Sequence, residues 1–253
     1  MNGIRGHSNL DSKLESGRMQ LELSVIIPTR NESESIVQVI RSTLGKLLAI
    51  ARSSEIIVVD DSTDRTTCNL NELAQTIKNL RVFHRTYATG VGSAIRLGLE
   101  KAQGRYAIIL MGDMPEDVKY ILPMFQKLED GYQVVSASRF LPGCKFVGYP
   151  IIKRVANLLC NLVMKIAFSR SDLRDFTTLL KGCDLEAIRE LGLEANEFDL
   201  GAEIAMKAIR RGLRTAEIPA DQFKRQAGFS KLSLSRQATL YAKRFVAVWL
   251  FFR

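Results

Sequence analysis

The feature that most constrains the fold of this chain is a regular alternation of short apolar runs with longer segments of helical period. The runs LSVIIPT (23–29) and EIIVVD (55–60) are rich in β-branched residues, which is typical of strands covered on both faces. Apolar residues recur at every third or fourth position between these runs, and this spacing indicates an amphipathic helix. Asn31, with Glu34 three residues later, is expected to cap that helix at its start.

The same alternation continues along the chain. It predicts further elements, namely strands at 81–86, 105–111 and 133–139 and helices near 65–79, 91–103 and 116–129. Strands that alternate with helices in this way build an α/β fold with a doubly wound, mainly parallel sheet. The 253 residues, 46% of them hydrophobic, suffice for a large core. We expect a flexible segment at 1–20, one large domain at 21–234 and an amphipathic helix at 235–253.

Polar side chains follow four of the predicted strands, at the points where these strands end. The segments are PTRNE (28–32), DDSTD (60–64), GDMPED (112–117) and SRF (138–140). Ligands of doubly wound sheets bind at the carboxyl ends of the strands. One polar residue there would be explained as a cap of the next helix, but Asp60, Asp61 and Asp64 are more than one helix start needs. This cluster therefore predicts a site for hydrogen-bond donors or a cation.

The charge of the chain is distributed unevenly. The net charge is +9, yet residues 1–138 hold 16 basic and 16 acidic residues. Residues 139–181 hold 8 basic and 2 acidic residues, and residues 204–253 hold 11 and 2. An excess of Lys and Arg attracts anionic partners over long range. The second half of the chain is therefore expected to face an anionic partner.

Several classes of protein do not fit the sequence. The four cysteines form no CxxC pair and only two histidines are present, so neither a disulfide framework nor a zinc site is indicated. The first twenty residues lack the apolar run of a signal peptide, and no stretch of about eighteen apolar residues occurs. We therefore expect a protein of a reducing compartment, the cytoplasm, without a spanning segment of its own.

Four motifs give a resemblance to a known family. VIIPTRNE, IIVVDDSTDRT, TGVGSAIRLGLEKAQGRYAIILMGDMPED and SASRF resemble family 2 glycosyltransferases with a GT-A fold, and in particular the branch of dolichyl-phosphate mannose synthase and polyprenyl-phosphate glucosyltransferases. The resemblance extends from about residue 22 to about residue 235. The glycines of TGVGSA do not form the GxGxxG pattern, which disfavours a nicotinamide enzyme.

The resemblance implies a donor side. Its residues bind the nucleotide part of a nucleotide sugar and are Pro28, Arg30, Glu32, Asp60 and Asp61. Asp113 is implied as a catalytic residue that holds Mg²⁺ or Mn²⁺ against the diphosphate. Met111 stands where the family has its first metal-binding aspartate, so Asp113 would share the cation with phosphate and water oxygens. Glu116 and Asp117 are expected mainly to start the next helix.

The resemblance also implies an acceptor side. Arg139 is implied as a catalytic residue, and the lipid phosphate would bind to Lys153, Arg154, Arg225 and Lys231. Asp175 begins DFTTLLKG, which resembles the family's DxxSGF element with Thr178 for Ser and Leu179 for Gly, and is expected to organise the basic residues. The segments 151–168 and 235–253 are apolar with basic residues interspersed, as in amphipathic helices at a membrane interface.

Together these features predict a peripheral enzyme on the cytosolic face of a membrane. It would transfer a sugar, with inversion, from a donor of the GDP-mannose or UDP-glucose type to a polyprenyl or dolichyl phosphate. No nucleic-acid partner is expected. An ionised phosphate oxygen needs no strong general base.

Three alternatives remain open. A family 2 enzyme that transfers to a hydroxyl would need a carboxylate base, for which Asp175, Asp199 and Glu203 are candidates. A degenerate scaffold would bind nucleotide sugars without turnover. A nucleotidyltransferase is disfavoured because PTRNESES has no glycine for a phosphate loop.

Overall fold

The computed structural model describes residues 21–50, 53–87, 89–113, 115–169, 171–223 and 234–252. The segment expected to be flexible, 1–20, lies outside the described residues. Seven strands form the main sheet: β1 (Leu23–Thr29), β2 (Ser54–Asp60), β3 (Leu80–His84), β4 (Tyr106–Ile109), β5 (Val134–Ser138), β7 (Lys181–Asp184) and β8 (Thr215–Pro219). The short strands β6 (Phe146–Val147) and β9 (Gln222–Phe223) pair with each other.

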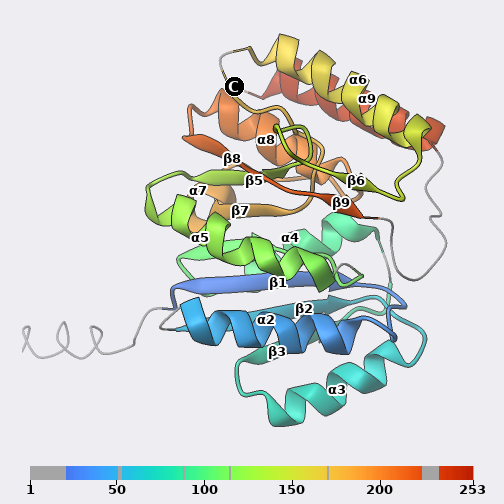
Figure 1. Ribbon diagram of the computed structural model, residues 1–253, viewed down its shortest axis with the longest axis vertical. Helices are drawn as coiled ribbons and strands as arrows, with labels where there is room; N and C mark the ends of the chain where they lie inside the picture. Colours follow the sequence, from blue (N-terminus) through green and yellow to red (C-terminus); the bar gives the residue numbers. More distant parts are fainter. Residues whose placement is uncertain are drawn as a thin grey trace, which may run out of the picture.

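The main sheet has the strand order β3-β2-β1-β4-β7-β5-β8. All neighbours pair in parallel except at β7, which runs antiparallel to both β4 and β5. The expectation of a mainly parallel sheet is confirmed (Figure 1). Strand β7 was not predicted, because KGCD has no run of β-branched residues to mark it.

Helices cover both faces of the sheet. The helices are α2 (Ile36–Ile50), α3 (Thr66–Thr76), α4 (Val91–Lys101), α5 (Ile121–Glu129), α6 (Ile151–Ala167), α7 (Leu185–Arg189), α8 (Leu200–Arg210) and α9 (Leu234–Phe251), with a 3-10 helix η2 (Pro115–Tyr120) before α5. Val25 and Ile27 of β1 pack with α2, α3 and α5, whereas Ile26 packs with α4, α7 and α8. Burial on both faces explains why β1 and β2 each contain an unbroken apolar run, at 25–27 and 56–59.

A third layer lies over α8. Ile204 and Ala208 of α8 pack toward the sheet, while Ala205 and Met206 pack with α6 and α9. Helices α6 and α9 therefore lie side by side at one end of the molecule, outside α8 (Figure 1). Val248 of α9 is 1% exposed within this cluster. The C-terminal helix thus packs on the sheet domain through α8.

Asn31 does not cap the first helix, contrary to expectation. Helix α2 begins only at Ile36, and Asn31 has a φ of 58°, a conformation that asparagine tolerates better than most residues. Its carboxamide oxygen accepts the N–H of Thr63 at 2.8 Å, and its own N–H donates to Ser62 Oγ at 2.8 Å. Asn31 instead ties the loop after β1 to the loop after β2.

Candidate active site

The parallel strands bring the predicted site residues to one edge of the sheet. Strands β1, β2, β4 and β5 all point the same way, so their carboxyl ends meet at that edge. Asp60 is the last residue of β2 and Asp61 follows it, while Asp113 and Arg139 lie just beyond β4 and β5. Acidic groups from the first half of the chain and a basic group from the second therefore share one edge.

Pro28 and Arg30 lie at the end of β1 but differ in exposure. Pro28 is buried within the strand, beyond the last β1–β4 pair of Ile26 with Ile109, where a missing N–H disturbs the ladder least. Arg30 follows the strand and is exposed. Only Arg30 of these two presents a charged side chain at the edge.

The loops after β1 and β4 are in close contact. Glu32 accepts a hydrogen bond from Thr29 Oγ1 at 2.8 Å, and a Cβ added to Gly112 would lie 2.3 Å from Glu32 Oε2. Ser35 Oγ also donates to the carbonyl of Gly112 at 2.9 Å. A side chain at 112 would have to displace the Glu32 carboxylate, and the approach brings the next residue, Asp113, which is 4% exposed, near the loop of the predicted donor residue Glu32.

Asp60 is held by three groups of the chain itself. Its carboxylate accepts the N–H of Ser62 at 3.0 Å and the hydroxyl of Thr67 at 2.9 Å, and it contacts His84 Nδ1 at 2.9 Å. Only 2% of Asp60 is exposed. Asp60 therefore shapes the loop after β2, and His84 is a neighbour that the sequence analysis did not assign.

Asp61 forms a bidentate ion pair with Arg85. Arg85 Nε donates to Asp61 Oδ1 at 2.6 Å and Nη2 donates to Oδ2, while Nη1 reaches Ser93 Oγ at 2.8 Å. The side chains of Arg85 and Asp61 are 14% and 5% exposed. Arg85 was not among the predicted site residues, although its place at the end of a predicted strand was a signal. The predicted donor residue Asp61 is thus paired with a basic residue, Arg85.

The residues around Asp113 fit a divalent cation that is bound by one protein carboxylate together with substrate phosphates and water. Among the described residues, no three His, Cys, Asp or Glu side chains cluster in a way that could hold a metal. Met111 packs against the core and offers no oxygen ligand. Mg²⁺ is often bound by one or two carboxylates together with substrate phosphates and water. Asp113, a buried carboxylate at the strand edge, fits that arrangement and not a cage built by the protein alone.

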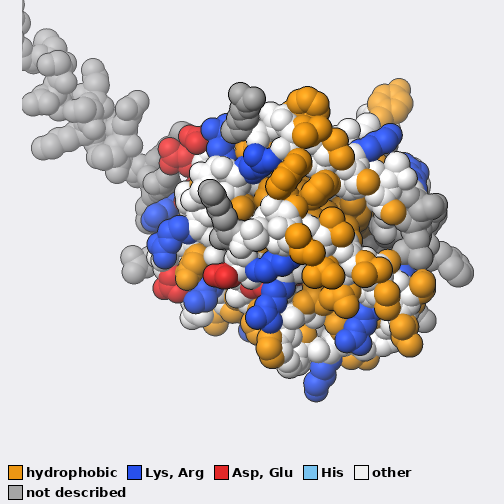
Figure 2. Space-filling model, turned by 90° about the horizontal axis from the view of Figure 1, so that it is seen from above, with side chains coloured by type: hydrophobic (Ala, Val, Ile, Leu, Met, Phe, Trp, Pro, Cys, Tyr) orange, Lys and Arg blue, Asp and Glu red, His pale blue; other side chains and the backbone are white. Residues whose placement is uncertain are grey.

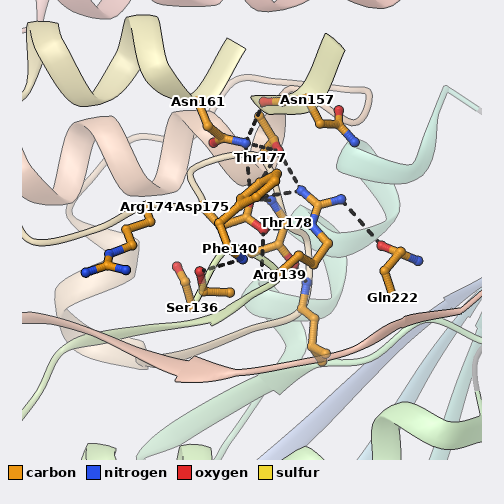
Figure 3. A network of polar contacts seen from close by, with 12 residues as sticks. Ser136, Arg139, Phe140, Asn157, Asn161, Arg174, Asp175, Thr177, Thr178 and Gln222 are labelled. Atoms are coloured by element: carbon orange, nitrogen blue, oxygen red, sulfur yellow. Dashed lines mark hydrogen bonds and ion pairs between the residues drawn. The ribbon is translucent and has the colours of Figure 1, made fainter. Parts of the chain in front are cut away.

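The predicted acceptor side contains an ion pair between Arg139 and Asp175 (Figure 3). Arg139 Nε donates to Asp175 Oδ2 at 2.7 Å, and Nη2 donates to Oδ1 at 2.8 Å and to Thr177 Oγ1 at 2.7 Å. Nη1 makes a long contact of 3.4 Å with Gln222 Oε1. Asp175 therefore fixes the guanidinium, and the Nη1 edge is the part best placed to donate to a ligand.

Burial and the ion pair shift the pKa of Asp175 in opposite directions. Asp175 is fully buried; burial alone would raise its pKa, but Arg139 more than offsets this effect and holds the pKa below its usual value. Burial raises the pKa of Glu217, although this carboxylate accepts the N–H groups of Arg174 at 2.8 Å and Asp175 at 2.7 Å. The segment that carries Asp175 is thus fixed through its backbone as well as its side chain.

Lys181 is a buried cation beneath this network. It is 0% exposed, its Nζ donates to Ser136 Oγ at 2.6 Å, and burial lowers its pKa to about 8, with Asp175 and Glu217 opposing the shift. An exposed lysine has a pKa of 10.5. Between pH 8 and 10.5 the unfolded chain therefore binds more protons than the folded one, so stability should rise with pH across this window.

We expect Lys181→Met to remove that rise. Urea unfolding of both proteins at several pH values should show the wild type gaining up to about 3 kcal/mol relative to the variant between pH 8 and 10.5. Other groups titrate in both proteins and cancel in the difference. A difference that stays constant with pH would show that Lys181 remains charged in the fold.

The remaining predicted acceptor residues lie on or beyond α6. Lys153 is half-buried, and Arg154 is exposed with its guanidinium 4.4 Å from the ring centre of Phe146. Such cation–π contacts orient an arginine without neutralising it. Arg225 and Lys231 lie outside the described residues.

Helices α6 and α9 expose an apolar surface at their end of the molecule (Figure 2). Its members on α6 include Ile151, Ile152, Leu159 and Ile166, each more than half exposed, and those on α9 include Leu250 and Phe251. A pocket of about 410 Å³ lies between the two helices. None of the described helices has the length and apolar character needed to cross a bilayer. A contiguous apolar surface of this kind marks an interaction site.

Comparison with known sequences identifies the family. Residues 24–192 match the model of the family described as Glycosyl transferase family 2, which is more than half of the chain. The chain belongs to glycosyl transferase family 2. It is therefore a glycosyltransferase, and its mainly parallel sheet is a GT-A fold.

Two curated relatives of this family 2 enzyme are about equally similar. Glycosyltransferase AglD of Haloferax volcanii is 27% identical over 235 residues, which are 90% of this chain but only 37% of that protein. The chain thus spans little more than a third of that relative. Undecaprenyl-phosphate mannosyltransferase of Micrococcus luteus is 28% identical over 226 residues, which are 84% of this chain and 88% of that protein.

Solved structures agree on the fold. Glucosyl-3-phosphoglycerate synthase from Mycobacterium tuberculosis, in complex with Mn²⁺, uridine diphosphate and phosphoglyceric acid, superimposes with a TM-score of 0.65. The match covers 97% of this chain and 84% of that one at 17% identity. At this identity the likeness concerns the fold alone.

The three candidate bases for a hydroxyl acceptor are all engaged within this glycosyltransferase. Asp175 pairs with Arg139, and Asp199 Oδ2 accepts from Arg244 Nε at 3.1 Å. Glu203, 0% exposed, accepts from Arg244 at 3.0 Å and from Lys207 at 2.9 Å. A carboxylate committed to buried ion pairs is a poor proton acceptor for a substrate. Asp199 and Glu203 instead attach α9 to α8.

Proposed function

We propose that this family 2 glycosyltransferase transfers a sugar from a nucleotide-diphospho-sugar to a polyprenyl phosphate at a membrane surface. The observation that carries the proposal is the position of Arg139. Its guanidinium is fixed by a buried carboxylate at the same sheet edge as Asp61 and Asp113, next to α6 with its exposed apolar side chains. The name of the relative from Micrococcus luteus supports the same substrate class.

On the donor side, the carboxylates after β2 suit a nucleoside. Carboxylate oxygens accept paired O–H or N–H donors of a ribose or a base more strongly than neutral groups do. Asp113 would hold Mg²⁺ or Mn²⁺ together with the donor's diphosphate, and that cation would supply charge stabilisation for the leaving group. Arg30, which is exposed after β1, would add positive charge on this side. A donor of the GDP-mannose or UDP-glucose type fits these residues.

On the acceptor side, the chemistry needs positioning and not a base. A phosphate monoester is ionised near neutral pH, so its oxygen can attack the anomeric carbon without losing a proton to the enzyme. Arg139 orients that phosphate through its Nη1 edge, and Lys153 and Arg154 add positive charge from α6. The expected course is a single displacement with inversion.

The apolar surface of α6 and α9 suits a membrane interface. Amphipathic helices with basic residues at their margins bind in the headgroup region of anionic bilayers. The pocket between the helices is lined by apolar side chains such as Leu159, Val163 and Phe245 and would take the beginning of the lipid chain. In this arrangement the enzyme is peripheral, on the cytosolic face of a membrane.

The proposal is tested by a panel of donors. We expect label from GDP-mannose or UDP-glucose to appear in the lipid phase when the purified protein is incubated with a polyprenyl phosphate and Mg²⁺ or Mn²⁺. Mass spectrometry of the lipid product should show one sugar per phosphate. Transfer only to a polyprenol or a glycan hydroxyl would replace this proposal by the hydroxyl-acceptor alternative.

A further inference from the structure

Asn161 of α6 makes polar contacts with Asp175 and with Thr177, which itself binds Arg139 (Figure 3). This asparagine faces inward from a helix whose outer side is apolar, and it is 2% exposed. Its Oδ1 accepts the N–H of Phe176 at 2.7 Å, and its Nδ2 donates to Thr177 Oγ1 at 3.1 Å. One side chain thus holds both the backbone and a side chain of the segment that carries Asp175.

The hydroxyl of Thr177 connects Asn161 to Arg139. Thr177 Oγ1 accepts from Arg139 Nη2 at 2.7 Å and from Asn161 Nδ2, and it donates to Asp175 Oδ1 at 3.1 Å. A hydroxyl offers one donor and two acceptor positions, so all three are used. Loss of Asn161 would therefore remove one of the three bonds that hold this hydroxyl in place against Arg139.

The outer face of the same helix belongs to the apolar surface. Leu158 and Leu162, the neighbours of Asn161 three positions before and one after it, are 50% and 52% exposed. Helix α6 therefore joins two environments within one turn, the apolar surface outside and the ion pair inside. Any shift of α6 relative to the sheet must alter the contacts of Asn161.

We infer that Asn161 is a positioning residue: through Thr177 it ties helix α6 to the guanidinium of Arg139 and sets the orientation of that guanidinium toward the acceptor. The role rests on the proposed function, since it assigns Arg139 to the acceptor. A buried amide is costly if its hydrogen-bonding groups are left unpaired. If position 161 served only the packing of α6, an apolar residue there would serve equally well.

The first test compares kinetics. With a short-chain polyprenyl phosphate in detergent, Asn161→Leu should lower kcat/KM for the acceptor about tenfold through KM, and leave the donor KM within about twofold. Thr177→Val, which removes only the connecting hydroxyl, should give a similar loss. The double variant should lose little more than either single variant, because both act through one contact.

Lys165→Met is the matched control. Lys165 ties the same helix to the same segment, since its Nζ donates to the carbonyl of Ser171 at 2.6 Å, but it makes no contact with Arg139 or Thr177. This variant should keep the acceptor KM of the wild type. Equal losses in Asn161→Leu and Lys165→Met, or losses of Asn161→Leu and Thr177→Val that simply add, would reduce Asn161 to an anchor of α6 and overturn the inference.

A second test does not depend on turnover. Exchange of the Arg139 Nε proton with solvent, followed by NMR and assigned with Arg139→Lys, should be slow in the wild type, because this proton is buried against Asp175. Asn161→Leu should accelerate it, and Lys165→Met should not. Unchanged exchange in Asn161→Leu overturns the positioning role by itself. If the wild type transferred nothing to polyprenyl phosphate while the exchange results held, only the proposed function would fail.

Discussion

Replacing Asp113 by asparagine should lower sugar transfer by about a thousandfold or more, the scale at which charge stabilisation of a leaving group operates. The amide keeps the shape of the side chain, which is 4% exposed behind Gly112, but it loses the charge that would face the cation. Donor binding should lose its dependence on Mn²⁺. The measurements are turnover with labelled donor and titration of the nucleotide with and without metal.

Asp64→Asn is the control for this variant. Asp64 belongs to the acidic cluster predicted from the sequence, but in the structure it is exposed and accepts the N–H of Thr66 at 2.9 Å at the start of α3, so it is not assigned to the ligand. The same change of acid to amide there should leave transfer within a few fold of the wild type. Turnover by Asp113→Asn within about tenfold of the wild type would remove Asp113 from the metal site.

The central part of the fold could be predicted because its signal is local. Strands β1 and β2 are buried on both faces, so their apolar runs stand out without any knowledge of their neighbours. Strand β7 could not be found in this way. It is four residues long, contains a lysine and a glycine, and is a strand only because β4 and β5 lie on either side of it. Its structure is set by tertiary contacts.

The same distinction applies to the site. Asp60, Asp61 and Asp113 could be placed at one edge from the strand pattern alone, since parallel strands share their carboxyl ends. Arg85 as the partner of Asp61 could not, because 24 residues separate the two and only their distance in the fold reveals the pair. The role of Asn161 could not be predicted for another reason. The sequence shows a polar residue on an otherwise apolar helix, but it does not show which groups that residue contacts.

Asn31 shows how a local rule can be overridden. Asparagine followed three residues later by glutamate is a helix-start pattern, yet the helix begins five residues after Asn31. The side chain satisfies the N–H of Thr63 in the neighbouring loop instead. In this fold the asparagine joins the two loops that line the edge of the sheet, and it does not start α2.

Arg139→Ala should raise the KM for a polyprenyl phosphate about ten- to a hundredfold, while the donor KM stays near that of the wild type. Each lost hydrogen bond to a charged group costs roughly 1.5 to 3 kcal/mol, which corresponds to this range. The change also leaves Asp175, which is 0% exposed, without its main cation. We therefore expect a loss of folding stability of about 3 to 5 kcal/mol in addition.

A double variant separates the two effects. Arg139→Met with Asp175→Asn removes both charges, so no buried carboxylate is left alone and much of the lost stability should return. Acceptor use should not return with it, because the Nη1 edge that would bind the phosphate is absent. Recovery of acceptor KM along with stability would mean that Arg139 serves only to neutralise Asp175.

The competing role for the basic half is adhesion to an anionic membrane. That role predicts losses of about 1 kcal/mol for each charge, alike for Arg139 and the exposed Lys243 of α9, and fading as salt is added. The double variant and Lys243→Ala should therefore be compared in detergent with a short-chain acceptor, where no membrane surface remains. We expect Lys243→Ala to recover most of its activity there and the double variant to stay impaired. If both use the soluble acceptor as well as the wild type does, Arg139 does not bind the phosphate, and its fixed position at the sheet edge only supports the structure beneath α6.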